Sequence, residues 1–235
     1  KVIGAPNLWL EVVRPPRQTS LVVEPENGRL PTLTDDGARR AEAWRTTSAP
    51  SYPYASVEDL RPYDRCITRG VLGSAFPNFY SSVTAIFQTP GFVIVRHEMI
   101  HETRVIPLDE RAHISSGIQQ WMGDSRGRWE GDTLVVETTN FNGRTGSFGR
   151  NGNGNPTTEA LRLVERIRLL DLETLEYEVR VVDPGTFTRP WTVRFSLPRD
   201  DDYVMYEYAC HAGNYALGNM LRGARAVERA ASSVQ

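Results

Sequence analysis

Residues 92–108 read FVIVRHEMIHETRVIPL and decide how this chain folds. The run contains the zinc-protease motif at His97, Glu98 and His101. That motif works only on an α-helix, because its two histidines must lie one turn apart to reach one zinc ion. Apolar and polar residues alternate along the run, however, which is typical of a β-strand, where residues four apart are separated by about 13 Å. The sequence therefore predicts a strand with no metal site, and a peptidase is the less favoured alternative.

One face of the expected strand carries His97, Met99 and His101 among aliphatic residues. Histidines on an apolar face are typical of a small-molecule site, because they place hydrogen-bonding and titratable groups against a hydrophobic cavity. We therefore expect His97 and His101 to be catalytic and Met99 to bind the ligand. The alternative is that both histidines are ordinary half-buried strand residues.

The opposite face carries charges of both signs, at Arg96, Glu98, Glu102 and Arg104. An exposed face of this kind forms cross-strand ion pairs that contribute about 0–1 kcal/mol each. If the face points inward instead, Glu98 and Arg104 become a buried acid and its guanidinium partner, a pair that orients or protonates substrates. The pattern leaves the buried face undecided, and Glu98 and Arg104 join the candidate catalytic residues.

Alternation of the same period continues from about residue 83 to residue 209, interrupted by turn residues. A meander of about eight strands must close or stack to protect its edges. The sequence therefore predicts an all-β fold, an antiparallel meander closing into a lipocalin-like barrel, with a β-sandwich as the alternative. The clearest strands are expected at residues 128–129, 133–141, 161–170, 175–181, 191–197 and 203–209.

The segments that flank these strands differ in composition. Residues 1–56 are rich in proline and turn formers, so we expect an extended arm packed on a single β domain of residues 57–235. Thr34 followed by two acidic residues predicts the N-cap of one short helix within the arm. Helical segments are also expected at residues 57–63 and 214–231, and the glycine- and asparagine-rich tract 145–155 is expected to be a mobile loop.

The charge balance excludes some classes of partner. Lysine and arginine number 27 against 29 aspartates and glutamates, a formal net charge of -2, so the chain has no general attraction for nucleic acid or for an anionic membrane. No run approaches the ~18 consecutive apolar residues that a membrane span needs. We therefore expect neither a nucleic-acid partner nor a membrane span.

Four further residues are candidates for ligand binding. They are His113, Trp121, Asp124 and His211. The last follows an expected strand and would lie at the rim of the same cavity. Asp124 and Ser125 near a histidine also suggest a serine hydrolase, but no Gly-x-Ser-x-Gly motif is present, so this interpretation is less favoured. Residues 124–127 are instead expected to form a turn.

Two cysteines, Cys66 and Cys210, flank the expected strands. In an exported protein a disulfide between them would close a long loop and stabilise the fold by about 4–5 kcal/mol in the chain-entropy model. Two ordinary buried thiols are the alternative, and the disulfide is favoured.

Five motifs span most of the chain: CITRG at 66–70, QTPG at 88–91, QWMGDSRGRWEGDTLVVETTNF at 120–141, TFTRPWT at 186–192 and YEYAC at 206–210. Together they resemble a family of exported proteins from soil and aquatic bacteria for which no activity is established. The resemblance implies a periplasmic or secreted location, which favours the disulfide. Members of that family usually carry a signal peptide and a further N-terminal stretch with a Gly-x-Trp element, whereas this sequence starts within the proline-rich part. If that stretch supplies a strand, the barrel is open or is completed by another protein.

Three functions are compatible with these observations. The first is a periplasmic or secreted isomerase, lyase or hydrolase that works by acid/base chemistry on an apolar ligand in the barrel cavity, without an organic cofactor. The second is a non-catalytic ligand-binding protein on the same scaffold. The third is an accessory structural subunit of a larger cell-envelope complex, which clasps a protein partner with its proline-rich arm. A closed, histidine-lined cavity is required by the first two functions and not by the third.

Overall fold

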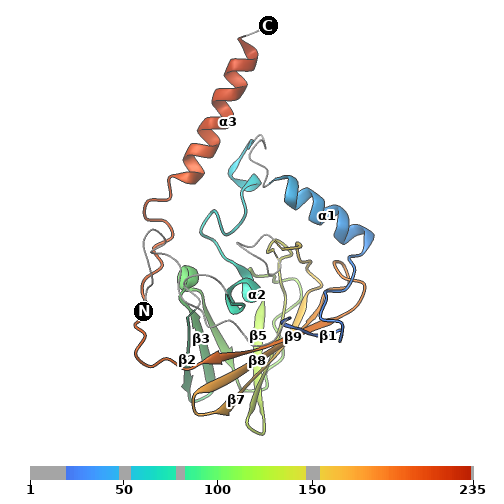
Figure 1. Ribbon diagram of the computed structural model, residues 1–235, viewed down its shortest axis with the longest axis vertical. Coiled ribbons are helices and arrows are strands. Elements are labelled where there is room, and N and C mark those ends of the chain that lie inside the picture. The colour runs from blue at the N-terminus through green and yellow to red at the C-terminus, as the bar shows by residue number, and fades with distance from the viewer. Residues whose placement is uncertain (1–19, 48–53, 78–82, 147–153, 234–235) are drawn as a thin grey trace.

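The computed structural model describes residues 20–47, 54–77, 83–146 and 154–233, and within them nine β-strands form two antiparallel sheets (Figure 1). The expected antiparallel, mostly β architecture is therefore confirmed. Three α-helices accompany the sheets: α1 (Asp35–Thr46), α2 (Gly70–Ala75) and α3 (Ala216–Ser232).

The larger sheet contains six strands. They are β1 (Val22–Glu24), β5 (Asp124–Glu130), β6 (Thr133–Thr139), β7 (Arg162–Asp171), β8 (Thr174–Val182) and β9 (Trp191–Pro198), in the order β1-β9-β8-β7-β6-β5. Alternation directs one face of each strand toward the core, as on β8, where Tyr177, Val179 and Val181 are buried. The proline-rich N-terminal segment contributes β1, which pairs with β9 at Val22 opposite Val193.

The smaller sheet contains β2 (Thr84–Thr89), β3 (Phe92–His97) and β4 (Thr103–Pro107), in that order. The single strand expected at residues 92–108 is therefore wrong, because the chain reverses in a 3-10 turn at Met99–His101. Ile100 and His101 have φ values of 57° and 47° there, in the left-handed region that non-glycine residues rarely adopt. The protease-like pentapeptide is thus the end of a strand and a turn, and not an α-helix.

This reversal changes which side chains face inward. On β3, Val95 and His97 are buried, whereas on β4 the buried residues are Arg104 and Ile106. His101 lies in the turn and is exposed. The expectation that His97 and His101 share one face is therefore wrong, since strand alternation does not continue through a turn.

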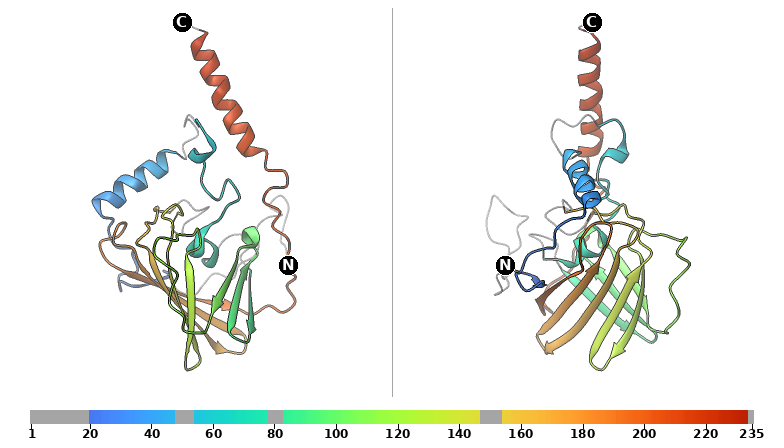
Figure 2. Two further views of the ribbon diagram at one scale, coloured as in Figure 1. Left: turned by 180° about the vertical axis from the view of Figure 1, so that it is seen from behind. Right: turned by 90° about the vertical axis from the view of Figure 1, so that its right-hand side faces the viewer.

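The two sheets pack face to face with the apolar core between them (Figure 2). At one border β4 lies against β5. Close approach depends on Gly127, where a Cβ would stand 2.8 Å from Ile106 Cγ2 and 2.7 Å from Leu108 Cδ2. In the described part of the chain no hydrogen-bonded ladder joins β4 to β5. The strands therefore form a sandwich-like pair of sheets rather than a closed barrel.

The helices occupy three different positions. α1 begins after Thr34, whose Oγ1 accepts a hydrogen bond from the Gly37 N–H at 2.9 Å, which confirms the expected cap and helix. α2 lies between the sheets at one end and is largely buried (Figure 1). α3 confirms the helical segment expected at 214–231, and it projects away from the sheets with no buried residue (Figure 2). Of the segment 57–63, only Val57–Asp59 is helical, as one 3-10 turn.

Two local expectations are wrong. Residues 203–209 alternate like a strand but belong to neither sheet. Residues 124–127 are not a turn but the start of β5, where pairing with β6 overrides their turn propensity. Residues 1–19 of the expected arm and residues 147–153 of the expected mobile loop lie outside the described residues.

Cys66 and Cys210 form a disulfide with a Cα–Cα distance of 5.7 Å, which confirms the favoured pairing. The bond joins the loop before α2 to the segment that leads to α3. It therefore fixes the C-terminal segment to the β-sheet body.

We expect the double variant Cys66→Ser/Cys210→Ser to unfold more easily than the wild type. The bond spans 144 residues, and releasing a loop of that length lowers the free energy of unfolding by about 4–5 kcal/mol in the chain-entropy model. Urea denaturation of both proteins measures the difference. Equal midpoints and slopes would show that the bond contributes nothing.

Candidate functional site

The centre of the interior holds an ion pair between the two sheets. Arg104 on β4 donates from both terminal guanidinium nitrogens to the two carboxylate oxygens of Glu165 on β7, each at 2.7 Å. The side chains are 4% and 0% exposed. Bidentate geometry of this kind is the strongest arrangement available to an arginine and a carboxylate.

Two further polar side chains complete this buried cluster. The Tyr177 hydroxyl, from β8, donates to Glu165 Oε1 at 2.8 Å. His97, from β3, is 3% exposed and shares a hydrogen bond of 3.0 Å between its Nδ1 and the Thr84 hydroxyl. The other ring nitrogen, His97 Nε2, is buried without a protein partner.

Burial and charge act in opposite directions on the ion pair. Burial alone would lower the pKa of Arg104, but the carboxylate of Glu165 raises it above its ordinary value. Burial alone would raise the pKa of Glu165, but Arg104 lowers it. Burial together with the Glu165 charge raises the pKa of Tyr177 well above its ordinary value. The pair therefore remains ionised, and the tyrosine hydroxyl keeps its proton.

The electrostatics of His97 make it neutral. Burial, reinforced by the positive charge of Arg104, lowers the pKa of His97 to about 3, although Glu165 acts in the opposite direction. An imidazole with this pKa carries no charge at neutral pH. It can accept or donate a hydrogen bond but does not supply a proton as an acid.

The space enclosed beside the cluster is small. It is lined by residues of both sheets, including Ile86, Val95, His97 and Tyr177, and measures about 20 Å³. That volume accommodates roughly one water molecule, whereas pockets for small ligands measure roughly 300–1,000 Å³. The cavity expected from the sequence is therefore filled by side chains.

A second buried carboxylate connects the 3-10 turn to α2. Glu102 accepts hydrogen bonds from the hydroxyls of Thr68 and Ser74 and from the backbone N–H of Arg69. Burial raises the pKa of Glu102, and these hydrogen bonds oppose the shift. Thr68 Oγ1 also accepts from the Gly70 N–H at 2.8 Å at the start of α2. The cluster therefore holds the turn against the helix.

Glu98 does not pair with Arg104, contrary to one expectation from the sequence. Its Oε2 accepts hydrogen bonds from the Tyr203 hydroxyl at 2.8 Å and from the Tyr206 N–H at 3.3 Å. Glu98 thus anchors the chain that follows β9. The exposed ion-pair ladder considered for this face is also wrong, because Glu98, Glu102 and Arg104 are all buried.

His113 and Asp124 do come together. His113 Nδ1 lies 2.8 Å from Asp124 Oδ2, and the Arg126 guanidinium donates to Asp124 Oδ1 at 2.8 Å. Ser125 points to the opposite face of β5, where its hydroxyl lies 2.9 Å from that of Thr138. These residues therefore do not form a Ser-His-Asp triad.

The other candidates lie apart from this cluster. Met99 is 1% exposed, and the Tyr63 hydroxyl contacts its sulfur at 3.7 Å. Trp121 is partly buried, and His211 is exposed beyond the disulfide. Of the nine candidate catalytic and ligand-binding residues, only His97 and Arg104 meet in the interior cluster.

Sequence reasoning missed Glu165 and Tyr177 as members of this cluster. A signal for Glu165 was present, because it shares a strand face with Leu161, Leu163 and Ile167. A carboxylate on an apolar strand face requires a buried cation as its partner. That partner is Arg104, whose inward direction depends on the turn at residues 99–101.

Among the residues that the structure describes, no three histidine, cysteine, aspartate or glutamate side chains lie close enough together to hold a metal ion. Nor does any described helix have the length and apolar character needed to cross a membrane.

The outer faces of the two sheets differ sharply. The outer face of the larger sheet carries a ladder of ion pairs, and its open depression of about 450 Å³ is lined by members of this ladder. Because each guanidinium there faces a carboxylate, the depression presents little unpaired charge to a ligand. The pairs are Arg162–Glu137, Arg166–Glu130, Arg168–Glu176, Arg180–Glu24 and Arg194–Glu178.

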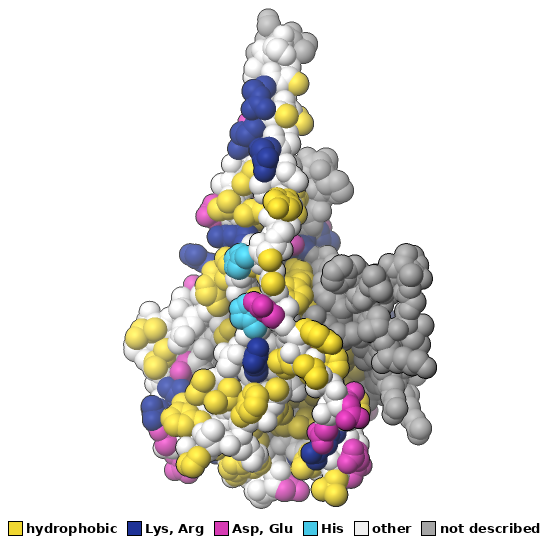
Figure 3. Space-filling view, turned by 90° about the vertical axis from the view of Figure 1, so that its left-hand side faces the viewer, with side chains coloured by type: hydrophobic (Ala, Val, Ile, Leu, Met, Phe, Trp, Pro, Cys, Tyr) yellow, Lys and Arg dark blue, Asp and Glu magenta, His cyan; other side chains and the backbone are white. Residues whose placement is uncertain are grey.

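The outer face of the smaller sheet is mostly apolar. Phe87 is 50% exposed, Phe92 36% and Val105 56%, and Ile94 lies between Phe87 and Val105 in the strand register. We call these four residues the apolar outer face. Figure 3 views the molecule from the side of β2 and β3, and hydrophobic side chains gather over the body there. A contiguous exposed apolar surface marks a site of interaction.

Comparison with known proteins adds no further constraint, because no protein-family model, curated protein or solved structure matches the chain.

We expect Glu165→Gln to lower the free energy of unfolding by about 3–5 kcal/mol, because it leaves the Arg104 charge buried without its counterion. A triple variant, Arg104→Met/Glu165→Leu/Tyr177→Phe, removes all the polar groups together and should recover most of the loss. Urea denaturation compares the three proteins. A triple variant less stable than Glu165→Gln would contradict the unpaired Arg104 charge as the cause of the loss.

His97 should make stability depend on pH. Above the ordinary histidine pKa of about 6.5, the ring is neutral in both states. Below that value the unfolded chain takes up a proton that the folded chain rejects until about pH 3. The free energy of unfolding should therefore fall by about 1.4 kcal/mol per pH unit as the pH decreases through this window. Denaturation of the wild type and of His97→Gln across the window isolates this contribution, and parallel pH profiles would contradict it.

Proposed function

We propose that this protein is an exported, non-catalytic accessory subunit that binds a protein partner in the cell envelope. The observation that carries the proposal is the packed interior, which leaves about 20 Å³ beside His97. An enzyme or carrier for an apolar molecule, built on a lipocalin-like barrel, needs roughly 300–1,000 Å³ of that space. An accessory subunit needs only a rigid body and a surface that fits its partner.

The chemistry of the interior supports the same choice. Both terminal nitrogens of Arg104 and the Tyr177 hydroxyl are engaged by Glu165, so these groups are not free to orient a substrate. His97 has a pKa lowered to about 3, whereas an efficient general acid or base has a pKa near the working pH. These residues are better explained as the bridge that fixes one sheet against the other.

The disulfide supports a location outside the cytoplasm. Bonds such as Cys66–Cys210 persist in the periplasm and in secreted proteins, whereas the cytoplasm keeps thiols reduced. The resemblance to a family of exported bacterial proteins points in the same direction.

The apolar outer face is the proposed contact surface. The segment 20–33 was expected to belong to the arm that clasps the partner, but it contributes β1 to the larger sheet. The apolar outer face has no such role within the described chain. Phe87, Phe92 and Val105 expose 36–56% of their surface. Burial of such residues at the centre of an interface contributes most of the binding energy.

We expect Val105→Lys to release the protein from its assembly in the cell envelope, with affinity weakened about tenfold or more, because a desolvated charge would replace an apolar contact. Cross-linked envelope extracts of the native host, separated by size, measure the shift from the large species to the free protein. Leu172→Lys is the matched control, since Leu172 is 76% exposed on the β7–β8 turn.

The variant His97→Gln distinguishes the proposed accessory role from the alternative of an acid/base enzyme. The variant should remain in the assembly and keep the function of the wild type in the host. Loss of function in His97→Gln with the assembly intact, or retention of Val105→Lys in the large species, would refute the accessory role.

A further inference from the structure

The edge of the smaller sheet is open to pairing. Among the described residues, β2 pairs only with β3, so no described strand occupies its second edge. The strand TAIFQT has six residues, with no charge and no proline. Its last four residues are exposed. An exposed edge strand without charge or proline readily adds another strand.

The other sheet borders are protected. β1 is only three residues long and ends at Glu24, which is followed by Pro25. The Glu24 carboxylate also binds Arg180 and accepts from the Thr192 hydroxyl. β4 and β5 lie against each other. Short length, charge and proline are the usual protections of an edge, and β2 has none of them.

We propose that β2 pairs antiparallel with β2 of a second copy of this chain, with Phe87 opposite Phe87 of the partner subunit. This inference rests on the proposed function, because it assigns a partner to the border of the apolar outer face. Residues directly opposite one another in an antiparallel pair point to the same side of a sheet. Centring the pair on Phe87 meets that condition, since Ala85 then faces Thr89 and Ile86 faces Gln88.

The charge pattern permits this symmetry. None of the six residues of β2 is charged, so the two-fold axis brings no like charges together. Arg96 is the nearest outward charge of the sheet, and its register partner is Ala85, at the far end of the strand from Thr89. The two Arg96 side chains of a dimer would therefore stand away from the axis and from each other.

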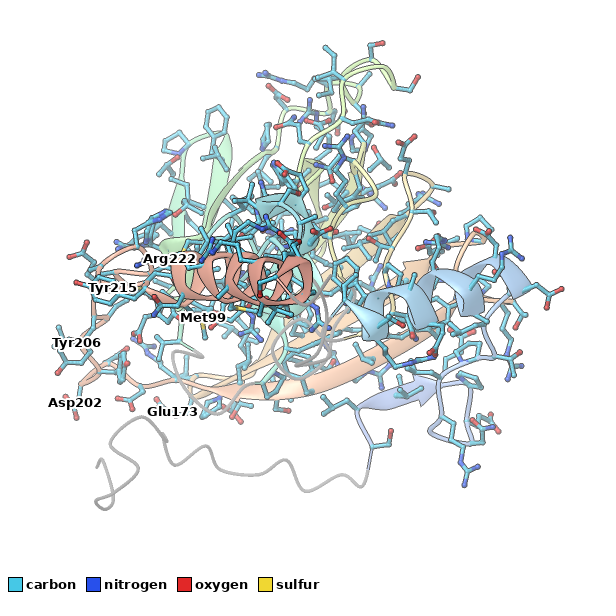
Figure 4. The ribbon with its side chains drawn as sticks, turned by 90° about the horizontal axis from the view of Figure 1, so that it is seen from above. Met99, Glu173, Asp202, Tyr206, Tyr215 and Arg222 are labelled. Carbon is cyan, nitrogen blue, oxygen red and sulfur yellow. A yellow bond between two sulfur atoms is a disulfide. The ribbon has the colours of Figure 1, made fainter. Side chains whose placement is uncertain are left out.

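A second copy is the occupant that this edge fits best. It offers an edge of the same length, the same lack of charge and the same alternation, as isologous dimers require. Pairing would join two three-stranded sheets into one of six strands and make the apolar outer faces continuous. In the view from above, Asp202 and Tyr206 lie at the periphery and point away from the body (Figure 4).

Sedimentation velocity over a range of concentrations tests the proposal. The wild type should be a dimer, and Phe87→Lys should be a monomer, because a charge at the centre of the edge blocks pairing. Leu172→Lys and Val105→Lys should both remain dimers, since neither residue lies on β2. A wild type that sediments as a monomer at every concentration overturns the inference.

Phe87→Cys provides a second test that does not require a charged variant to fold. Opposed Cα atoms in an antiparallel pair lie about 4.5–5.5 Å apart, within the range of a disulfide. Mild oxidation should therefore convert Phe87→Cys to a covalent dimer and leave Val105→Cys monomeric in denaturing gels. Equal cross-linking of the two variants overturns the proposed register.

The two proposals fail separately. If the wild type is a monomer but Val105→Lys still leaves the envelope assembly, only the second copy is rejected. If the wild type is a dimer but Val105→Lys stays in the assembly, only the accessory role is rejected. A monomeric wild type rejects the dimer even if Phe87→Lys leaves the assembly, because Phe87 also belongs to the apolar outer face.

Discussion

The ion pair between Arg104 and Glu165 is the constraint on which the fold depends. A guanidinium and a carboxylate that are both excluded from water destabilise the protein severely unless they meet each other. Because one comes from β4 and the other from β7, their bidentate contact fixes how the smaller sheet lies against the larger. An apolar contact tolerates sliding, whereas a two-point hydrogen-bonded contact does not. The Tyr177 hydroxyl adds a third attachment, from β8, to the same carboxylate.

This bridge also explains why so little space remains between the two sheets. Side chains as large as arginine, glutamate and tyrosine occupy the centre of the sandwich, and the two charges among them, Arg104 and Glu165, pair with each other. What remains beside His97 is about 20 Å³, roughly the space of one water molecule. To bind an apolar molecule there, the two sheets would have to separate, and the Arg104–Glu165 pair would be exposed to water. The proposed contact surface lies on the outside of the sandwich, where its use leaves this ion pair undisturbed.

Much of the fold was predictable from alternation, because β7, β8 and β9 lie within two residues of the expected strands. The candidate site was not predictable, because a single turn escaped detection in the sequence. The reversal at Met99–His101 contains no glycine, proline or asparagine, so turn chemistry gave no signal, and one strand was expected where there are two. That error placed His101 on the same predicted face as His97, and it left undecided whether the Arg104 side chain points inward. Residues 203–209 show the opposite error, since they alternate like a strand but pair with none of the described strands. Pairing is a property of distant segments, which local patterns do not contain.

The contrast between the two outer faces supports the choice of the apolar outer face as the proposed contact surface. On the larger sheet, cross-strand pairs such as Arg194–Glu178 make a hydrated surface with little to gain from association. A solvent-facing antiparallel sheet normally has polar residues outside, and that sheet follows the rule. The smaller sheet departs from it at Phe87, Ile94 and Val105, which line up across all three strands. Phenylalanine and valine on an outer face add nothing to the core that the opposite face already packs. Their position is explained if the face is covered, and the open edge of β2 beside them supplies the hydrogen bonds that would hold the cover in register.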